Sequence, residues 1–183
     1  MKHYLITDPK YYTSKPQQFL ETLLSISKQK PIHYICIRDK VTSNYQDLAT
    51  IISENRSLFA DQKLYLHTHL DLAVALNFDG IHLPSNAIDD IVTAKTKGLE
   101  VIYSAHSLED ALKAQYFGAD AVSISPIFAT PNKGKPLGLE KLKEINDKIT
   151  LNCFALGGII SQEHIDACEQ AGVFGFASIR YFL

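Results

Sequence analysis

Short apolar segments rich in β-forming residues alternate with longer helical patterns along the whole chain. Gly98, Gly118 and Gly172 each end a helical pattern just before the next apolar segment, a position that favours glycine. Regular alternation of this kind predicts parallel strands covered by helices. The predicted strands are His3–Thr7, Ile32–Ile37, Lys63–His67, Gly80–Leu83, Glu100–Ser104, Ala121–Ile124, Asn152–Leu156 and Gly175–Ser178. The predicted helices are Gln17–Lys28, Tyr45–Asn55, Leu70–Leu76, Ala87–Lys97, Leu108–Phe117, Leu139–Ile145 and Gln162–Ala171.

The number of predicted strands indicates how the sheet closes. Eight strands suit a (β/α)8 barrel, so we predict an α/β fold, a TIM barrel formed by residues 1–183 as a single domain. The chain is shorter than the ~200 residues usual for such barrels, and only Ile179–Leu183 follow the last strand. We therefore expect a compact barrel with a truncated final helix. An open doubly wound sheet is the alternative, but no long connection marks a reversal of strand order.

The composition narrows the class of protein. Hydrophobic residues make up 46% of the chain and charged residues 21%, which suits a globular core. A net charge of -2 gives no surface-wide field for nucleic acid, so we expect no nucleic-acid partner. The absence of a signal peptide or membrane-length apolar run favours a cytoplasmic protein with no membrane partner. Cys36, Cys153 and Cys168 are odd in number and lack CxxC spacing, which disfavours a disulfide framework or a zinc site.

The segment Ser125–Leu139 contains three Pro, two Gly and two Lys between a predicted strand and a predicted helix. Such stiffness and charge are more than a connector needs, so we interpret the segment as a ligand-binding loop. Ser125, Thr130 and Lys133 suit a ligand that carries phosphate.

Other predicted strand ends carry groups of the same kind, and strand ends are where barrels build their sites. Alternation places Arg38 on the same face as Cys36, so Arg38 and Lys40 are expected to clamp a phosphate or pyrophosphate. A solvated loop with an Arg38–Asp39 pair is the alternative. After the last two strands, Gly157-Gly158 and Ala177-Ser178 form small-residue loops of the type that binds phosphate through backbone N–H groups.

Four histidines lie at or near strand ends: His67, His69, His82 and His106. Each alone is more often a structural residue than a functional one. Together they make a neutral-pH acid or base plausible, with His106, His67 and His69 as candidate catalytic residues and His82 as a substrate-binding residue. No Asp or Glu stands near enough in sequence to complete a metal site with His67 and His69, so we expect no bound metal there.

Several segments, taken in order, resemble the thiamine phosphate synthase/TenI family of (β/α)8 barrels, and they cover nearly the whole chain. They are Leu5-Ile6-Thr7, Ile37-Arg38-Asp39-Lys40, Asp71-Leu72-Ala73, Asp79-Gly80-Ile81-His82-Leu83, Ser104-Ala105-His106-Ser107-Leu108-Glu109, Ser125-Pro126-Ile127-Phe128-Ala129-Thr130 with Lys133, Pro136-Leu137-Gly138, and Leu156-Gly157-Gly158-Ile159.

The Leu83-Pro84-Ser85 loop is more similar to the TenI branch. That likeness implies a thiamine-biosynthesis protein that binds a thiazole phosphate and transfers a proton as a tautomerase, without a cofactor. His106 matches a histidine of that branch. The branch's other histidine corresponds to Pro126, so His67 or His69 is expected to supply the missing proton carrier.

The alternative implied by the resemblance is thiamine phosphate synthase, which joins hydroxymethylpyrimidine pyrophosphate to a thiazole phosphate. In that enzyme Mg²⁺ holds the pyrophosphate, and Arg38, Lys40 and Lys133 match its cations. A non-catalytic phosphate-binding or regulatory barrel is a second alternative. All three imply a small phosphorylated thiazole or pyrimidine as ligand.

The chain departs from the synthase pattern at both magnesium carboxylates. Where the pattern has acids after the third and fourth strands, this chain has His67-Thr68-His69 and Pro84-Ser85-Asn86. Asp89 or Asp90 could replace them only if the loop is shifted.

The short C-terminus is expected to leave apolar surface uncovered near Tyr181–Leu183, which suggests a homodimer contact.

Overall fold

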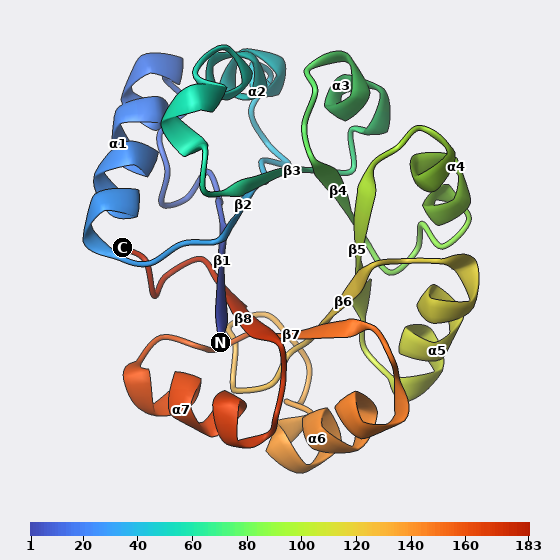
Figure 1. Ribbon diagram of the computed structural model, residues 1–183. Helices are drawn as coiled ribbons and strands as arrows, with labels where there is room; N and C mark the ends of the chain where they lie inside the picture. The colour runs from blue at the N-terminus through green and yellow to red at the C-terminus, as the bar shows by residue number, and fades with distance from the viewer.

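The computed structural model describes residues 1–183 as a closed barrel of eight parallel strands, arranged in the order β1 to β8 with β8 pairing with β1 (Figure 1). Each predicted strand is present within two residues of its expected bounds, which confirms the predicted TIM barrel. The strands are β1 (Lys2–Ile6), β2 (Tyr34–Ile37), β3 (Lys63–His67), β4 (Gly80–Leu83), β5 (Glu100–Ala105), β6 (Ala121–Ile124), β7 (Asn152–Leu156) and β8 (Gly175–Ser178).

Seven helices surround the barrel as an outer ring (Figure 1). Helix α5 shows why they form where they do: the Ser107 hydroxyl accepts a hydrogen bond from the Asp110 N–H at 3.1 Å, and Gly118 ends the helix with φ of 89°. The helices are α1 (Pro16–Gln29), α2 (Tyr45–Glu54), α3 (Leu70–Ala75), α4 (Asp90–Thr96), α5 (Leu108–Phe117), α6 (Gly138–Lys148) and α7 (Gln162–Gln170), with a 3-10 turn at Arg56–Phe59.

Aromatic side chains fill the inside of the barrel toward the start of the strands. Tyr4 is fully buried there, and its ring lies 6.1 Å from that of Tyr65 and 5.2 Å from that of Phe154. The space for these rings depends on Gly80, where an added Cβ would lie 2.3 Å from the Tyr65 ring. Cys36 is also buried inside, as the alternation argument assumed. These rings fill the interior at the starts of the strands, and a cavity lies at the opposite end of the barrel.

The chain ends without an eighth helix, as the sequence predicted. The expected uncovered apolar surface is present only in part: Phe182 is 2% exposed and stacks on Phe176 of β8 with the ring centroids 5.9 Å apart, whereas Leu183 is 55% exposed. The Lys30 ammonium group at the end of α1 contacts the Tyr181 ring and its carbonyl oxygen. The short tail therefore covers the barrel beside α1 (Figure 1), and the homodimer contact stays a prediction.

None of the helices combines the length and the apolar character needed to span a membrane.

Candidate functional site

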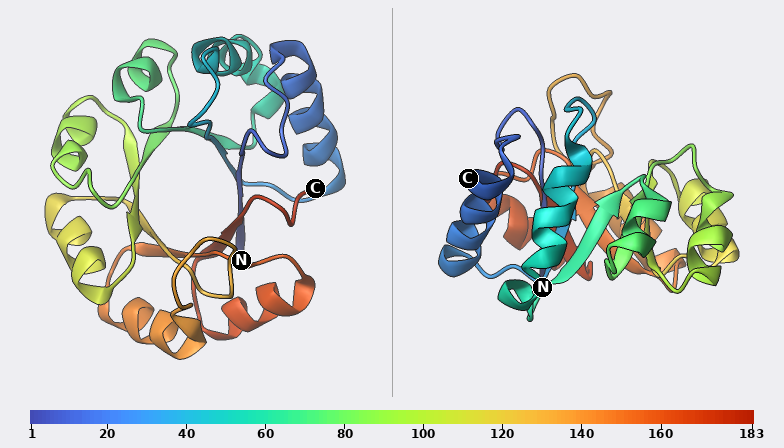
Figure 2. Two further views of the ribbon diagram at one scale, coloured as in Figure 1. Left: turned by 180° about the vertical axis from the view of Figure 1, so that it is seen from behind. Right: turned by 90° about the horizontal axis from the view of Figure 1, so that it is seen from above.

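A cavity of about 260 Å³ lies at the C-terminal ends of the strands. The β2–α2 and β6–α6 loops project beyond this end of the barrel (Figure 2, right). Of the predicted site residues, every one except His69 lines the cavity: Arg38, Lys40, His67, His82, His106, Ser125, Thr130, Lys133, Gly157, Gly158, Ala177 and Ser178. Ser85, Ser104 and Arg180 also line it, although sequence reasoning did not select them.

The loops after β7 and β8 present free backbone donors to this cavity. No hydrogen bond within the chain uses the N–H groups of Gly157, Gly158, Ile179 or Arg180. Ser178 holds the two loops together, because its hydroxyl donates to the Ile159 carbonyl oxygen at 2.7 Å. Backbone N–H groups that have no partner and point toward one place can donate hydrogen bonds to phosphate oxygens.

The glycine pair is needed for a close approach between loops. Gly157 and Gly158 have φ of 99° and 71°, a region that strains other residues. An added Cβ at Gly157 would lie 2.8 Å from the Pro126 Cα, and one at Gly158 would lie 2.7 Å from the Ala129 carbonyl oxygen. The β7 loop therefore forms the support on which the β6–α6 loop rests.

The β6–α6 loop is tied to this support at its start. The Ile127 N–H donates to the Leu156 carbonyl oxygen and the Phe128 N–H to the Gly157 carbonyl oxygen, both at 3.0 Å. Farther along the loop, Lys133 lines the cavity and Lys135 does not. Lys135 can therefore serve as a control for Lys133, because both lysines lie in the same loop and only Lys133 lines the cavity.

At the end of β2, Arg38 is fixed by the end of β1. Its guanidinium Nη1 lies 2.6 Å from a carboxylate oxygen of Asp8, and its backbone N–H donates to the Thr7 hydroxyl at 2.9 Å. The partner of Arg38 is thus Asp8 and not the neighbouring Asp39. Nearby, burial, Arg38 and Lys133 lower the pKa of Lys40, in that order of importance. The cations of the β2 and β6 loops are therefore close enough to interact electrostatically.

His82 lies at the base of the cavity in a buried polar network. One ring nitrogen lies 2.9 Å from the Tyr4 hydroxyl, and the other lies 3.0 Å from the Ser104 hydroxyl and 3.2 Å from that of Ser123. Burial, followed by Arg38 and Lys40, lowers the pKa of His82 to about 3. A neutral His82 can position a ligand by hydrogen bonding but is a poor proton carrier near neutral pH.

The other three histidines separate into different environments. Burial, and then His82, lowers the pKa of His67 to about 2, so His67 stays neutral. His106 lies exposed at the cavity, where its Nδ1–H donates to the Ser125 carbonyl oxygen at 2.7 Å. Because a carbonyl only accepts, that bond leaves the His106 Nε2 to exchange protons with a ligand.

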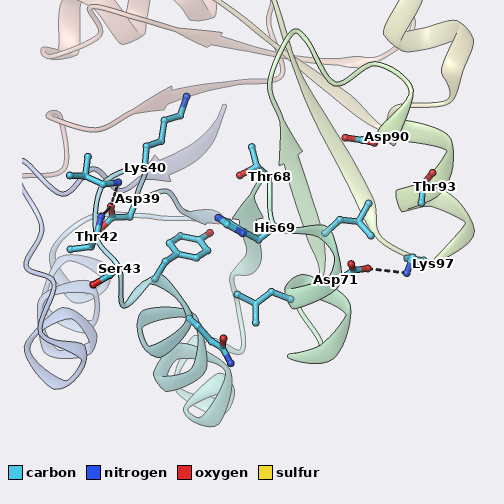
Figure 3. A pocket seen from close by; sticks show the side chains of 15 residues that line it. Asp39, Lys40, Thr42, Ser43, Thr68, His69, Asp71, Asp90, Thr93 and Lys97 are labelled. Carbon is cyan, nitrogen blue, oxygen red and sulfur yellow. Dashed lines mark hydrogen bonds and ion pairs between the residues drawn. The ribbon is translucent and has the colours of Figure 1, made fainter.

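His69 does not reach the cavity. Its ring packs on Tyr45 with the centroids 4.5 Å apart and lines an adjoining open groove, which shares Lys40 with the cavity (Figure 3). Thr68, with φ of 68°, interrupts the strand alternation that would have placed His69 on the same side as His67. The structure therefore gives no geometric support for a catalytic role of His69.

The cavity does not fit a bound Mg²⁺, because its lining includes no Asp or Glu. Mg²⁺ binds through one or two carboxylates together with substrate phosphates. Asp90 lines the adjoining groove with His69 (Figure 3), and Asp89 lines neither the groove nor the cavity. No cluster of His, Cys, Asp and Glu in the structure has a metal-binding arrangement. The shift that would let Asp89 or Asp90 replace the missing acids is not observed.

Comparisons with known proteins agree with the fold and the strand-end motifs. A family model described as thiamine monophosphate synthase matches residues 3–182. A putative thiamine-phosphate synthase 2 from Aquifex aeolicus is 37% identical over 98% of this chain and 96% of the relative. A thiamine-phosphate synthase from Desulfitobacterium hafniense is 31% identical over 98% of this chain and 88% of the relative.

Among solved structures, a thiamine phosphate pyrophosphorylase from Pyrococcus furiosus superposes with a TM-score of 0.80 and 26% identity. The match covers 97% of this chain and 85% of that protein.

Proposed function

Because the chain belongs to the thiamine monophosphate synthase family, we propose that it joins hydroxymethylpyrimidine pyrophosphate to a thiazole phosphate. The observation that carries the proposal is a single cavity with two kinds of anion-binding group. Lys40 and Lys133 supply cations from one side, and the Gly157-Gly158 loop supplies free N–H groups from another. A reaction between a diphosphate and a monophosphate needs both kinds of group within one site.

The chemistry of this reaction assigns a role to each half of the cavity. The bond between the pyrimidine methylene carbon and the diphosphate oxygen breaks, and diphosphate leaves with the electron pair. The thiazole nitrogen forms the new bond to that carbon. Cations beside the leaving diphosphate stabilise its growing negative charge, while the backbone donors hold the thiazole phosphate in place.

The proposal is tested by incubating the purified chain with both substrates and measuring thiamine phosphate by chromatography, in parallel with Mg²⁺ and with EDTA. Lys133→Ala is expected to reduce product formation at least about tenfold, because a charge-assisted hydrogen bond contributes roughly 1.5–3 kcal/mol. Lys135→Ala, in the same loop but outside the cavity, is the matched control and is expected to keep activity. No product from the wild-type chain under either condition would contradict the proposal.

A second candidate is the tautomerase-type proton transfer on a thiazole carboxylate phosphate. The names of the relatives favour the synthase over this reaction, which sequence reasoning placed first. The observation in its favour is His106, whose Nε2 is free to exchange a proton in a cavity without carboxylates. Isomerisation of the thiazole substrate, lost on His106→Ala while thiamine phosphate formation is absent, would favour this candidate over the synthase.

A further inference from the structure

Three of the four cations that line the cavity lack anionic partners. None of the ion pairs in the chain involves Lys40, Lys133 or Arg180. Only Arg38 has a carboxylate partner, Asp8, which is not itself part of the lining. Four cationic side chains and no carboxylate therefore face one cavity, and this imbalance favours a ligand with several negative charges.

From this arrangement we propose that the diphosphate group binds directly to Arg38, Lys40 and Lys133, with no divalent cation between it and the protein. The inference rests on the proposed function for the identity of the anion. Its physical basis is the donor set: guanidinium and ammonium groups contact phosphate oxygens directly, whereas proteins usually hold Mg²⁺ through one or two carboxylates, which this cavity lacks.

The net charge of the site is the same with or without a metal bound by two carboxylates. A divalent cation held by two carboxylates adds no net charge to a site. A chain that has neither the carboxylates nor the metal therefore offers a diphosphate the same net charge as one that has all three. The segments that replace the family acids, His67-Thr68-His69 and Pro84-Ser85-Asn86, contain no carboxylate, so no leftover negative charge repels the anion.

The positions of the three cations support the same ligand. They come from two loops at the same end of the barrel, and Lys40 interacts with both Arg38 and Lys133. Holding these like charges together costs free energy in the absence of a ligand, and an anion between them removes that cost. Arg180 lies on the β8 side, beside the N–H groups that suit the monophosphate, and completes the positive lining.

The test is isothermal titration calorimetry of the full chain with inorganic diphosphate, first in EDTA and then with excess Mg²⁺. We expect the wild-type chain to bind in EDTA. Added Mg²⁺ is expected to leave the affinity unchanged or weaken it, because Mg²⁺ competes for the free anion in solution. Lys40→Ala and Lys133→Ala are each expected to weaken binding about tenfold or more in EDTA, and Lys135→Ala to bind as the wild type does.

A reverse variant introduces what the cavity lacks. Ser85 lines the cavity with an exposed side chain, so Ser85→Asp adds a carboxylate there without disturbing the core. We expect this variant to bind diphosphate about tenfold more weakly in EDTA. It is also expected to recover affinity when Mg²⁺ is added, unlike the wild type.

Three results would overturn the inference: binding by the wild type only when Mg²⁺ is present, no binding under either condition, or equal binding by all of the lysine variants. Its failure can be distinguished from failure of the proposed function. Product formation that requires Mg²⁺, together with Mg²⁺-dependent diphosphate binding, would keep the function and reject the inference. Diphosphate binding in EDTA without product would do the opposite.

Discussion

The Gly158→Ala substitution tests whether the β7 loop supports the phosphate site. With φ of 71°, any residue other than glycine costs roughly 1–2 kcal/mol at this position. The new Cβ would also lie 2.7 Å from the Ala129 carbonyl oxygen and 2.7 Å from the Phe128 Cβ. Relief of that overlap costs about 1–3 kcal/mol more. We therefore expect the free energy of unfolding to fall by about 2–5 kcal/mol.

Gly118→Ala is the matched control, because it shares the backbone strain but not the crowding. Gly118 has φ of 89° and no heavy atom within 4 Å of an added Cβ, so only about 1–2 kcal/mol is expected to be lost. Urea unfolding measures both variants. Calorimetry with a thiazole phosphate then measures the site, and we expect binding to be lost in Gly158→Ala and kept in Gly118→Ala.

Two results would refute this reasoning about Gly158. Equal destabilisation by the two variants would mean that the β6–α6 loop moves away freely and is not supported by the glycine pair. Unchanged thiazole phosphate binding in Gly158→Ala would mean that the N–H groups of this loop do not hold the phosphate. Either result would leave the barrel fold unquestioned, but it would contradict the proposed role of the β7 loop in forming the phosphate site.

Three further predictions follow from the site and the tail. His106→Ala is expected to reduce any proton transfer on the thiazole about 100-fold or more, measured by deuterium exchange in NMR; a loss below about tenfold would exclude it as the proton carrier. Phe182→Ala is expected to cost about 3–5 kcal/mol in urea unfolding, and Leu183→Ala, which is 55% exposed, less than about 0.5; equal effects would show that the tail does not cover the barrel. Because folding keeps His67 and His82 neutral, the unfolded chain binds more protons below pH ~6.5, so stability is expected to fall as pH decreases by up to about 1.4 kcal/mol per pH unit for each; His67→Gln is expected to lower that slope by up to about 1.4 kcal/mol per pH unit between about pH 5 and 6, and an unchanged slope would contradict the low pKa of His67.

The strands could be predicted from sequence because each is a short, nearly continuous apolar segment that only a doubly covered sheet can bury. Helix boundaries depend more on local turns. The segment Ala87–Asp89 has a helical composition, but the Ala87 N–H closes a turn on the Pro84 carbonyl oxygen, and α4 begins only at Asp90. The burial of Phe182 could not be predicted from the sequence, because it depends on stacking against the Phe176 ring in the space where an eighth helix would lie.

The site was predictable where the chain follows strand alternation. Arg38 is inside because Cys36 is, and sequence reasoning needed no more than that period. His69 was misplaced because the same period was carried through Thr68, whose left-handed backbone ends it. Arg180 was overlooked because the residues after the last strand were interpreted as apolar surface, although a cation two positions after Ser178 was a usable signal.

The two missing magnesium carboxylates of the family pattern belong to one sector of the barrel mouth. The rims of β6, β7 and β8 keep the lysine loop, the glycine pair and the free N–H groups, and the rim of β2 keeps its two cations. The rims of β3 and β4 lack the family acids: His67-Thr68-His69 and Pro84-Ser85-Asn86 stand there instead, and His67 and Ser85 line the cavity. A loss of phosphate binding altogether would have removed cations and glycines, because unpaired cations repel one another without a ligand. Their retention beside a sector without carboxylates supports the proposal that a phosphorylated ligand binds there without a protein-held metal.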